Sequence, residues 1–412
     1  MGSDWCSSSW GDEVILEYGK AIRGYSQTHG KYRVFGSNGP IGWTSDALTK
    51  GPGVILGRKG AYRGVEFCRE PFWVIDTAYY LVPKNDLDMR WLYYAVKHYK
   101  LGEIDDGSPI PSTTRAAVYM LELDIPPKKE QRAIAHILGT LDDKIECNRR
   151  MNETLEAMAR ALFKAWFVDF EPVRAKLDGR WQRGQSLPGL PSHLYDLFPD
   201  RLVDSELGPI PQGWESAMLS EFATLNSESW TKRTRPEKIR YIDLSNTKWG
   251  HIENVMNYKS EVAPSRAQRV LRPLDTVVGT VRPGNGSYAL ITDDGLTGSS
   301  GFAALRPLGP EYAEFVYLAA TSCENIERLS NLADGGAYPA VHPEMVSSTQ
   351  VCHAGKDLIK VFSRQTSLMF ACIANNKHQS RTLAQLRDTL LPKLISGELR
   401  IKDVERILGG EL

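Results

Sequence analysis

Stretches that mix basic with aromatic side chains, three of the four also containing several glycines, recur along this sequence. Two lie in the first half, at residues 31–39 and 57–64, and two lie in the second half, at residues 230–235 and 281–288. Lysine and arginine neutralise phosphates, arginine and asparagine form paired hydrogen bonds with guanine and adenine, and glycine allows a close approach of the backbone. Each stretch alone is typical of a solvated turn. The recurrence of four of them makes nucleic-acid binding an equal alternative.

No arrangement of residues in the chain predicts catalysis. The eight histidines are dispersed, and the sequence lacks the G-x-x-x-x-G-K-[ST] pattern of a phosphate-binding loop. Gly51, Gly53 and Gly57 only superficially resemble a dinucleotide-binding loop, because the segment is typical of a strand. Asp142 and Asp143 form an acidic cluster, which we interpret as a solvated helix face instead of a metal site. We therefore expect no catalytic residue and no metal ligand.

The composition is that of an ordinary globular protein without net charge. The chain has 412 residues, 50 Lys and Arg against 50 Asp and Glu, 42% hydrophobic residues and 24% charged residues. This length predicts two or three domains. The zero net charge argues against a simple polyanion binder, because such domains usually carry a basic excess.

Apolar runs and cysteine usage indicate the cellular compartment in which the protein works. No run of 18 or more apolar residues occurs, so we expect no membrane span, and the first residues lack the pattern of a signal peptide. The six cysteines are scattered singly, which indicates free thiols in a reducing environment. We expect a cytoplasmic protein.

An internal repeat divides the sequence into two halves. The motif DGSPIP at residues 106–111 recurs as DGGAYP at residues 334–339, an offset of 334 − 106 = 228 residues. Toward the N-terminal end of each half the match loosens. Each half is therefore a variable portion followed by a better matched one. The pairs of corresponding positions include Asn148 with Asn376, Trp10 with Trp214, and Gly57 with Gly279.

The variable portions have the pattern of mixed α/β domains. Short apolar runs bounded by Gly, Pro or Asp predict strands, and short helical patterns occur at residues 89–100 and 311–325. The predicted strands lie at residues 54–56, 72–75, 240–244, 276–278 and 302–305.

The matched portions predict two long helices, at about residues 128–168 and 356–396. Positions spaced alternately by four and three residues over residues 134–166 form a heptad seam, and a weaker seam lies 228 residues later. Ordinary core helices are the alternative, but the length, spacing and duplication favour a two-helix coiled coil. Two repeats related by a pseudo-two-fold axis would make it antiparallel. Asn148 and Asn376 then fall at the midpoints, where we expect them to meet and fix the register.

Motifs at residues 31–39, 54–60, 72–77, 125–134, 148–155 and 391–400, taken in this order, resemble those of the specificity subunits of type I restriction–modification enzymes. The second half departs from the pattern, because residues 351–358 lack the paired prolines and the Glu-Gln of the first half. The second long helix can therefore start less sharply than the first, and the two contacts with methyltransferase subunits that the resemblance implies need not be equivalent. The motifs that carry the resemblance are KYRVFGSNG at 31–39, VILGRKG at 54–60, FWVIDT at 72–77, IPPKKEQRAI at 125–134, NRRMNETL at 148–155 and LPKLISGELR at 391–400.

The resemblance implies an α+β fold in which two mixed α/β target-recognition domains are separated by two long antiparallel helices in a coiled coil, with an internal pseudo-two-fold duplication. Each domain would recognise one half of a bipartite DNA target. The helices would set the spacer and dock two methyltransferase subunits, and motor-nuclease subunits would join the full complex. The implied parts are target-recognition domain 1 (1–124), long helix 1 (125–170), a linker (171–205), target-recognition domain 2 (206–352), long helix 2 (353–400) and a C-terminal tail (401–412).

The resemblance also implies a non-catalytic chain without a cofactor, because S-adenosylmethionine, ATP and Mg²⁺ would belong to the partner subunits. A stand-alone DNA nuclease or fused restriction enzyme is the alternative, and a scaffold whose domains bind protein is a third. The residues that we expect to contact DNA are Arg23, Ser37, Asn38, Arg58, Lys59, Arg233, Arg235, Arg282, Asn285 and Tyr338.

Overall fold

Two helices of 40 residues each are the longest elements of the computed structural model. They are α4 (Lys128–Phe167) and α9 (Lys356–Ile395). Both begin at the predicted residue and end one residue earlier than predicted. Each predicted seam position on them is buried or partly buried. At 1.5 Å per residue, each helix is about 60 Å long.

The chain divides into two compact units, and both long helices contribute to each. Unit 1 contains residues 1–148 and 378–412, and unit 2 contains residues 149–377. The fold is α+β, as expected. The structure describes residues 5–105, 107, 110–206, 208–231, 233–336 and 338–401. The predicted C-terminal tail beyond residue 401, and parts of the DGSPIP and DGGAYP motifs, therefore lie outside the described residues.

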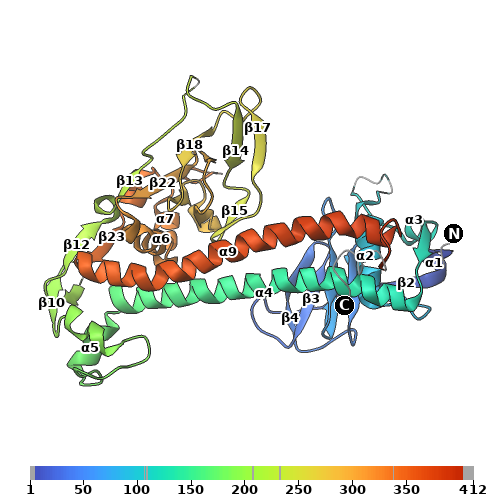
Figure 1. The fold of residues 1–412 in the computed structure, drawn as a ribbon, viewed down its shortest axis with the longest axis horizontal. Helices are drawn as coiled ribbons and strands as arrows, with labels where there is room; N and C mark the ends of the chain where they lie inside the picture. The colour runs from blue at the N-terminus through green and yellow to red at the C-terminus, as the bar shows by residue number, and fades with distance from the viewer. Residues whose placement is uncertain are drawn as a thin grey trace. The chain divides into compact units, whose positions relative to one another are not determined.

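Within each unit, the segments of α4 and α9 run side by side in opposite directions (Figure 1). In unit 1, Asn148 Nδ2 donates hydrogen bonds to Gln379 Oε1 (2.9 Å) and Ser380 Oγ (3.2 Å). In unit 2, Asn376 Nδ2 donates to Asn152 Oδ1 (2.9 Å). The offset of 228 relates Asn148 to Asn376 and Asn152 to Ser380, so the same contact is made in both units. The predicted meeting of Asn148 with Asn376 concerns residues of different units and stays a prediction.

Further contacts give the direction of the helices. In unit 1, Asp142 pairs with Arg387 (2.7 Å), six residues before Asn148 and seven residues after Ser380. In unit 2, the rings of Phe163 and Phe362 lie 6.1 Å apart between centroids. Residue numbers thus rise on α4 as they fall on α9, which is the antiparallel direction.

The two units share a core arrangement of strands, although the second sheet has three strands in unit 1 and four in unit 2. A four-stranded antiparallel sheet has the order β2-β8-β5-β6 in unit 1 and β13-β22-β19-β20 in unit 2. A second sheet pairs β3 with β7, or β14 with β21, in parallel. A short antiparallel ladder joins β1 to β9, or β12 to β23. The duplication predicted from the sequence is therefore present in the topology.

The bounds of these elements are as follows. In unit 1, the strands are β1 (Cys6–Ser9), β2 (Val14–Tyr18), β3 (Tyr32–Gly36), β4 (Gly39–Thr44), β5 (Gly53–Gly57), β6 (Val65–Cys68), β7 (Phe72–Val74), β8 (Ala78–Pro83) and β9 (Glu122–Ile125), and the short helices are α1 (Trp10–Glu13), α2 (Met89–His98) and α3 (Arg115–Tyr119). In unit 2, the strands are β10 (Leu202–Ser205), β11 (Gly208–Pro211), β12 (Glu215–Met218), β13 (Ala223–Leu225), β14 (Lys238–Ile242), β15 (Thr247–Lys248), β16 (His251–Ile252), β17 (Met256–Lys259), β18 (Ala267–Leu271), β19 (Thr276–Gly279), β20 (Tyr288–Leu290), β21 (Leu296–Ser299), β22 (Phe302–Pro307) and β23 (Gln350–His353). The short helices of unit 2 are α5 (Glu171–Leu177), α6 (Ala313–Ala320), α7 (Cys323–Leu332) and α8 (Glu344–Ser347).

The short ladders fix the register of the repeat. Strands β9 and β23 are related by the offset of 228, and each pairs with the first strand of its half, β1 or β12. Aligning β1 with β12 places Trp5 at the position of Trp214, and Trp10 at that of Leu219. The predicted pairing of Trp10 with Trp214 is therefore wrong. The sequence comparison aligned the two tryptophans because they are the same residue type. The structural correspondence is instead set by the backbone hydrogen bonds between the strands.

Helix α2 docks the first domain onto α4 through charged groups. Arg90 bonds to the Asp143 carboxylate (2.6 Å) and to the Gly139 carbonyl (2.9 Å), and Tyr94 Oη donates to Asp142 (2.6 Å). A Cβ atom at Gly139 would lie 2.4 Å from the Arg90 guanidinium, so a larger residue there would displace the Arg90 side chain. The interpretation as a solvated helix face holds for Asp143, whose side chain is 50% exposed, but not for Asp142, which is 21% exposed, and both carboxylates anchor the domain.

Helix α6 docks the second domain through a more buried set of groups. Arg160 of α4 donates to the Thr321 carbonyl (3.0 Å) and pairs with Glu156 (2.7 Å). Tyr317 of α6 donates to the same Glu156 (2.9 Å), and its burial raises its pKa well above the usual value. Hydrogen-bonded partners offset the cost of burying these polar groups.

A carboxylate bridges two arginines within the second domain. Glu228 accepts two hydrogen bonds from Arg272 (2.8 Å each) and pairs with Arg306, which also contacts the buried Asp275 (2.9 Å). The hydrogen bonds from Arg272 and then from Arg306 lower the pKa of Glu228 to about 2. These groups tie the loop before β14 to β18 and β22.

The linker packs against the second half of α4. Trp181, Leu194 and Phe198 are buried, and the ring of Phe198 lies 5.2 Å from that of Trp166 between centroids. The linker is therefore anchored to α4 by these buried side chains.

Candidate nucleic-acid interface

In each unit, two loops are joined by backbone hydrogen bonds at the end of a central strand. In unit 1, the loop after β5 meets the loop before α3: Gly60 N–H donates to the Pro111 carbonyl (3.0 Å), and Thr113 N–H donates to the Arg58 carbonyl (2.9 Å). We call residues 58–64 and 110–113 the paired loops of unit 1. The second of these loops carries the described part of the DGSPIP motif.

Unit 2 repeats this construction. Arg282 N–H donates to the Pro339 carbonyl (2.7 Å), and Val341 N–H donates to the Thr280 carbonyl (2.9 Å). Residues 280–286 and 338–341 are the paired loops of unit 2. The second loop again carries the last two residues of the repeated motif, Tyr338 and Pro339. These last two positions of the motif thus take part in the paired loops of both halves.

The structure brings four of the candidate residues of unit 1 close together. Ser37 and Lys59 exchange hydrogen bonds between the Ser37 hydroxyl and the Lys59 backbone. Asn38 is exposed next to Ser37 in the turn between β3 and β4. Arg58 donates to the Asp76 carbonyl (2.9 Å). Arg23 is exposed in the loop between β2 and β3. Ser37 is thus engaged in pinning the loop, whereas Asn38 and Lys59 present their side chains to solvent.

In unit 2, the structure brings together three of the five candidates. Arg282 lies over the ring of Tyr338, with 4.7 Å between the guanidinium carbon and the ring centroid, and Asn285 N–H donates to the Arg282 carbonyl (2.9 Å). Arg233 and Arg235 lie on the separate loop before β14. Arg235 is held there, because it donates to the Ala267 carbonyl (2.8 Å), while Arg233 is exposed.

Sequence reasoning missed a cluster in which two arginine side chains lie over the ring of one tyrosine, Tyr18. The guanidinium carbons of Arg115 and Arg58 lie 4.2 Å and 4.9 Å from the ring centroid of Tyr18. Burial and a hydrogen bond with Tyr18 raise the pKa of the adjacent Tyr79 to about 12. Arg115 follows the DGSPIP motif closely, which was a usable signal, but no sequence pattern links it to Tyr18. Strand pairing of β2 with β8 brings these residues together.

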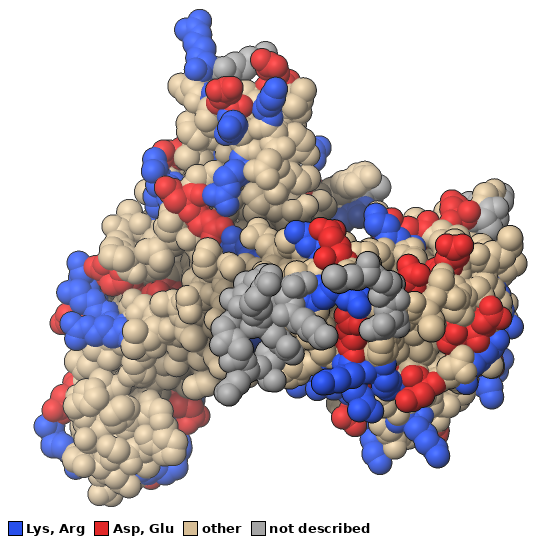
Figure 2. Space-filling model, turned by 45° about the vertical axis from the view of Figure 1, so that its right-hand side comes forward, with Lys and Arg blue, Asp and Glu red and all other residues tan. Residues whose placement is uncertain are grey.

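On the face that Figure 2 shows, the described residues form no large basic patch. Figure 2 shows basic and acidic side chains interspersed on the visible face. This agrees with the net charge of zero. Attraction of a polyanion therefore depends on local groups such as the paired loops.

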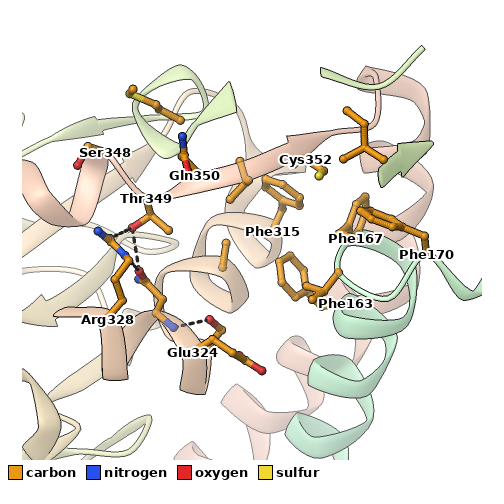
Figure 3. A pocket seen from close by; sticks show the side chains of 17 residues that line it. Phe163, Phe167, Phe170, Phe315, Glu324, Arg328, Ser348, Thr349, Gln350 and Cys352 are labelled. Atoms are coloured by element: carbon orange, nitrogen blue, oxygen red, sulfur yellow. Dashed lines mark hydrogen bonds between the residues drawn. The ribbon is translucent and has the colours of Figure 1, made fainter. Parts of the chain in front are cut away.

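A cavity of about 650 Å³ lies in unit 2 among α4, α6, α7 and β23 (Figure 3). Phe163, Phe167 and Phe315 line its apolar side. On its polar side, Arg328 donates to Thr349 Oγ1 (2.9 Å), so these groups satisfy one another. In the part of the chain that the structure describes, no group of three or more His, Cys, Asp or Glu side chains could hold a metal ion. No helix among the described residues combines the length and apolar character needed to cross a bilayer.

Comparisons with known proteins agree with this arrangement. Residues 13–157 match the family model described as "Type I restriction modification DNA specificity domain". The chain is 26% identical over 344 residues to the type I restriction enzyme HindI specificity subunit of Haemophilus influenzae, which covers 74% of each chain. It is 24% identical to the MjaIX specificity subunit of Methanocaldococcus jannaschii, covering 79% of this chain and 72% of that one.

A solved structure shares the fold. The crystal structure of a type I restriction–modification S subunit from M. genitalium superimposes with a TM-score of 0.57, at 19% identity, over 95% of this chain and 96% of that one. The family match, the two relatives and the shared fold agree with the resemblance seen in the sequence motifs. Residues 13–157 thus match the type I restriction modification DNA specificity domain, and over most of its length the chain is similar to type I restriction enzyme specificity subunits.

Proposed function

We propose that this chain is the DNA sequence-recognition subunit of a type I restriction–modification complex, in which each domain recognises one half of a bipartite target. The observation that carries the proposal is the duplicated frame of paired loops. The same backbone construction presents different side chains in the two units, as expected if two domains recognise two different half-sites. Similarity to type I restriction enzyme specificity subunits supports the same role.

We assign the first half-site to residues 1–124 and the second to residues 206–352. The long helices, at 125–170 and 353–400, form an antiparallel coiled coil that sets the number of unread bases between the half-sites. The antiparallel contacts of α4 and α9 within each unit support this part. The two major-groove sites are expected near one turn of duplex apart, about 34 Å.

Catalysis in this proposal belongs to partner subunits in the cytoplasm. Two methyltransferase subunits would dock on the helices and supply S-adenosylmethionine chemistry, and motor-nuclease subunits would use ATP and Mg²⁺. The chain itself is a non-catalytic scaffold. Its neutral surface supports a division of labour in which partners contribute much of the contact with DNA. We therefore expect weak binding of DNA by the isolated chain at physiological salt, and tight, specific binding would contradict this division.

Long-read mapping of methylated bases tests the proposal. Cells that express the chain together with its methyltransferase subunit should methylate a two-part motif with a fixed spacer. Cells that express the methyltransferase subunit alone are the control and should show no such motif. Absence of any motif that depends on this chain would refute the proposal.

A cleavage assay tests the alternative of a stand-alone nuclease. The purified chain is incubated with plasmid DNA and Mg²⁺ without partners. We expect the plasmid to stay intact, and cleavage would overturn the scaffold role.

A further inference from the structure

We propose that Arg282, held against Tyr338, recognises a guanine in the second half-site, and that this stack gives the second domain a specificity element which the first domain lacks. The inference rests on the proposed function and adds to it a residue and a base.

The geometry of the pair suits base recognition. The Arg282 guanidinium carbon lies 4.7 Å from the centre of the Tyr338 ring, and both residues are exposed, Tyr338 with 72% of its surface accessible. An aromatic ring attracts the face of a guanidinium, whose N–H donors lie along its edge. That edge matches the O6 and N7 acceptors of guanine in the major groove. Stacking also limits the conformers of the Arg282 side chain before binding, so binding costs less conformational entropy.

The backbone holds this pair in place. Arg282 N–H donates to the Pro339 carbonyl (2.7 Å), directly after Tyr338 in the chain. Arg282 has a φ of +48°, a left-handed conformation that is uncommon for residues other than glycine. Such conformations persist where the surrounding structure enforces them, and they concentrate at functional sites. An arginine at a position that favours glycine indicates that the side chain is needed there.

The register of the repeat shows that the first domain has no such pair. Gly60 and Ile110 occupy the positions of Arg282 and Tyr338, because the hydrogen bond of Gly60 to Pro111 corresponds to that of Arg282 to Pro339. The reverse also holds for the tyrosine cluster of unit 1. Thr280, Pro343 and Ser227 in unit 2 stand at the positions of Arg58, Arg115 and Tyr18.

Each domain therefore places its arginine–tyrosine stack at a different point of one frame. A base contact made by Arg282 would belong to the second half-site alone. Loss of this contact should leave recognition of the first half-site intact, so the first half-site serves as an internal control for the experiment.

Methylation mapping with variants of the full chain, expressed with its methyltransferase subunit, tests the inference. Arg282→Lys keeps the charge but loses the planar fork. We expect the preference for guanine at one position of the second half-site to fall about tenfold or more, with the first half-site unchanged. Tyr338→Phe keeps the ring and should retain the preference, whereas Tyr338→Ala should weaken it at the same position. Arg201→Lys, at an exposed arginine of the linker outside the expected DNA contacts, is the matched control and should leave that position unchanged.

The outcomes separate the inference from the proposed function. If the unmodified chain directs methylation to a two-part motif but Arg282→Lys alters no position, the inference is wrong. A uniform loss of methylation in Arg282→Lys, with thermal unfolding unchanged, would mark Arg282 as a phosphate contact and would also overturn it. If the unmodified chain directs no motif at all, the proposed function itself fails.

Discussion

The glutamine near the start of α4 offers a quantitative test of how the first domain is fixed to its helix. Gln131 is 2% exposed. Its Nε2 donates to the Pro126 carbonyl (2.9 Å), and its Oε1 accepts from Asp88 N–H (2.8 Å), at the residue that caps α2. One side chain thus ties the start of α4 to the start of α2. At the equivalent position of the second half stands the buried Ile359, so only unit 1 depends on this clasp.

The change Gln131→Met keeps the length and volume of the side chain and removes both hydrogen bonds. Two buried backbone groups lose their partner, at about 1–3 kcal/mol each. Because methionine fills the space, no cavity term is added. We expect the free energy of unfolding of unit 1 to fall by about 2–4 kcal/mol, which corresponds to roughly 5–15 °C in Tm for a unit of this size.

Hydrogen exchange followed by mass spectrometry is the appropriate assay, because two units need not unfold in one transition. Amides in residues 84–98 and 126–135 should lose protection, while amides of α6 in unit 2 keep theirs. Gln27→Met, at an exposed glutamine of the same unit, is the control and should change little. A loss below about 0.5 kcal/mol, or an equal loss of protection in unit 2, would refute the reasoning.

Four further predictions address charge, pairing, register and spacing. The pKa of Glu228 is lowered to about 2, so its contribution to the stability of unit 2 is present above its ordinary pKa and is lost as the pH falls toward 2. Glu228→Gln should flatten this part of an acid-unfolding curve, and an unchanged curve would contradict the prediction. Asp142→Asn and Arg387→Met should each destabilise unit 1 by about 1–3 kcal/mol, and a double-mutant cycle by urea unfolding should show a coupling above about 1 kcal/mol, whereas additive losses would exclude a direct interaction. Asn376→Leu should destabilise unit 2 by about 1–2 kcal/mol, because Asn152 loses its hydrogen-bond donor. Changing both Asn376 and Asn152 to leucine should recover this loss, and a double variant less stable than the single one would argue against the seam contact. Insertion of about one helical turn into each long helix should lengthen the tolerated spacer by a base pair or more, and methylation mapping that shows an unchanged spacer would contradict the role of the helices.

Local patterns in the sequence were sufficient for the long helices and the duplication. The heptad spacing over residues 134–166 and the offset of 228 depend only on side-chain periodicity and on similarity between segments, which the sequence states directly. The same holds for the asparagines of the seam, because their place within the heptad is a matter of counting. The bounds of α4 and α9 accordingly agree with prediction to within one residue.

Tertiary structure alone decided which side chains work together. Arg115 lies 97 residues from Tyr18, and the two meet because β2 pairs with β8 and the loop before α3 returns to β5. The partners of Asp142 and Asp143 come from α2, so their role in docking a domain could not be separated from a solvated helix face by helix periodicity. Arg235 and Arg282 look alike in the sequence, yet Arg235 donates to the Ala267 carbonyl, whereas Arg282 stacks on the ring of Tyr338. Periodicity fixes which face of an element is apolar, whereas long-range strand pairing and backbone hydrogen bonds between loops determine which polar groups remain available to bind DNA.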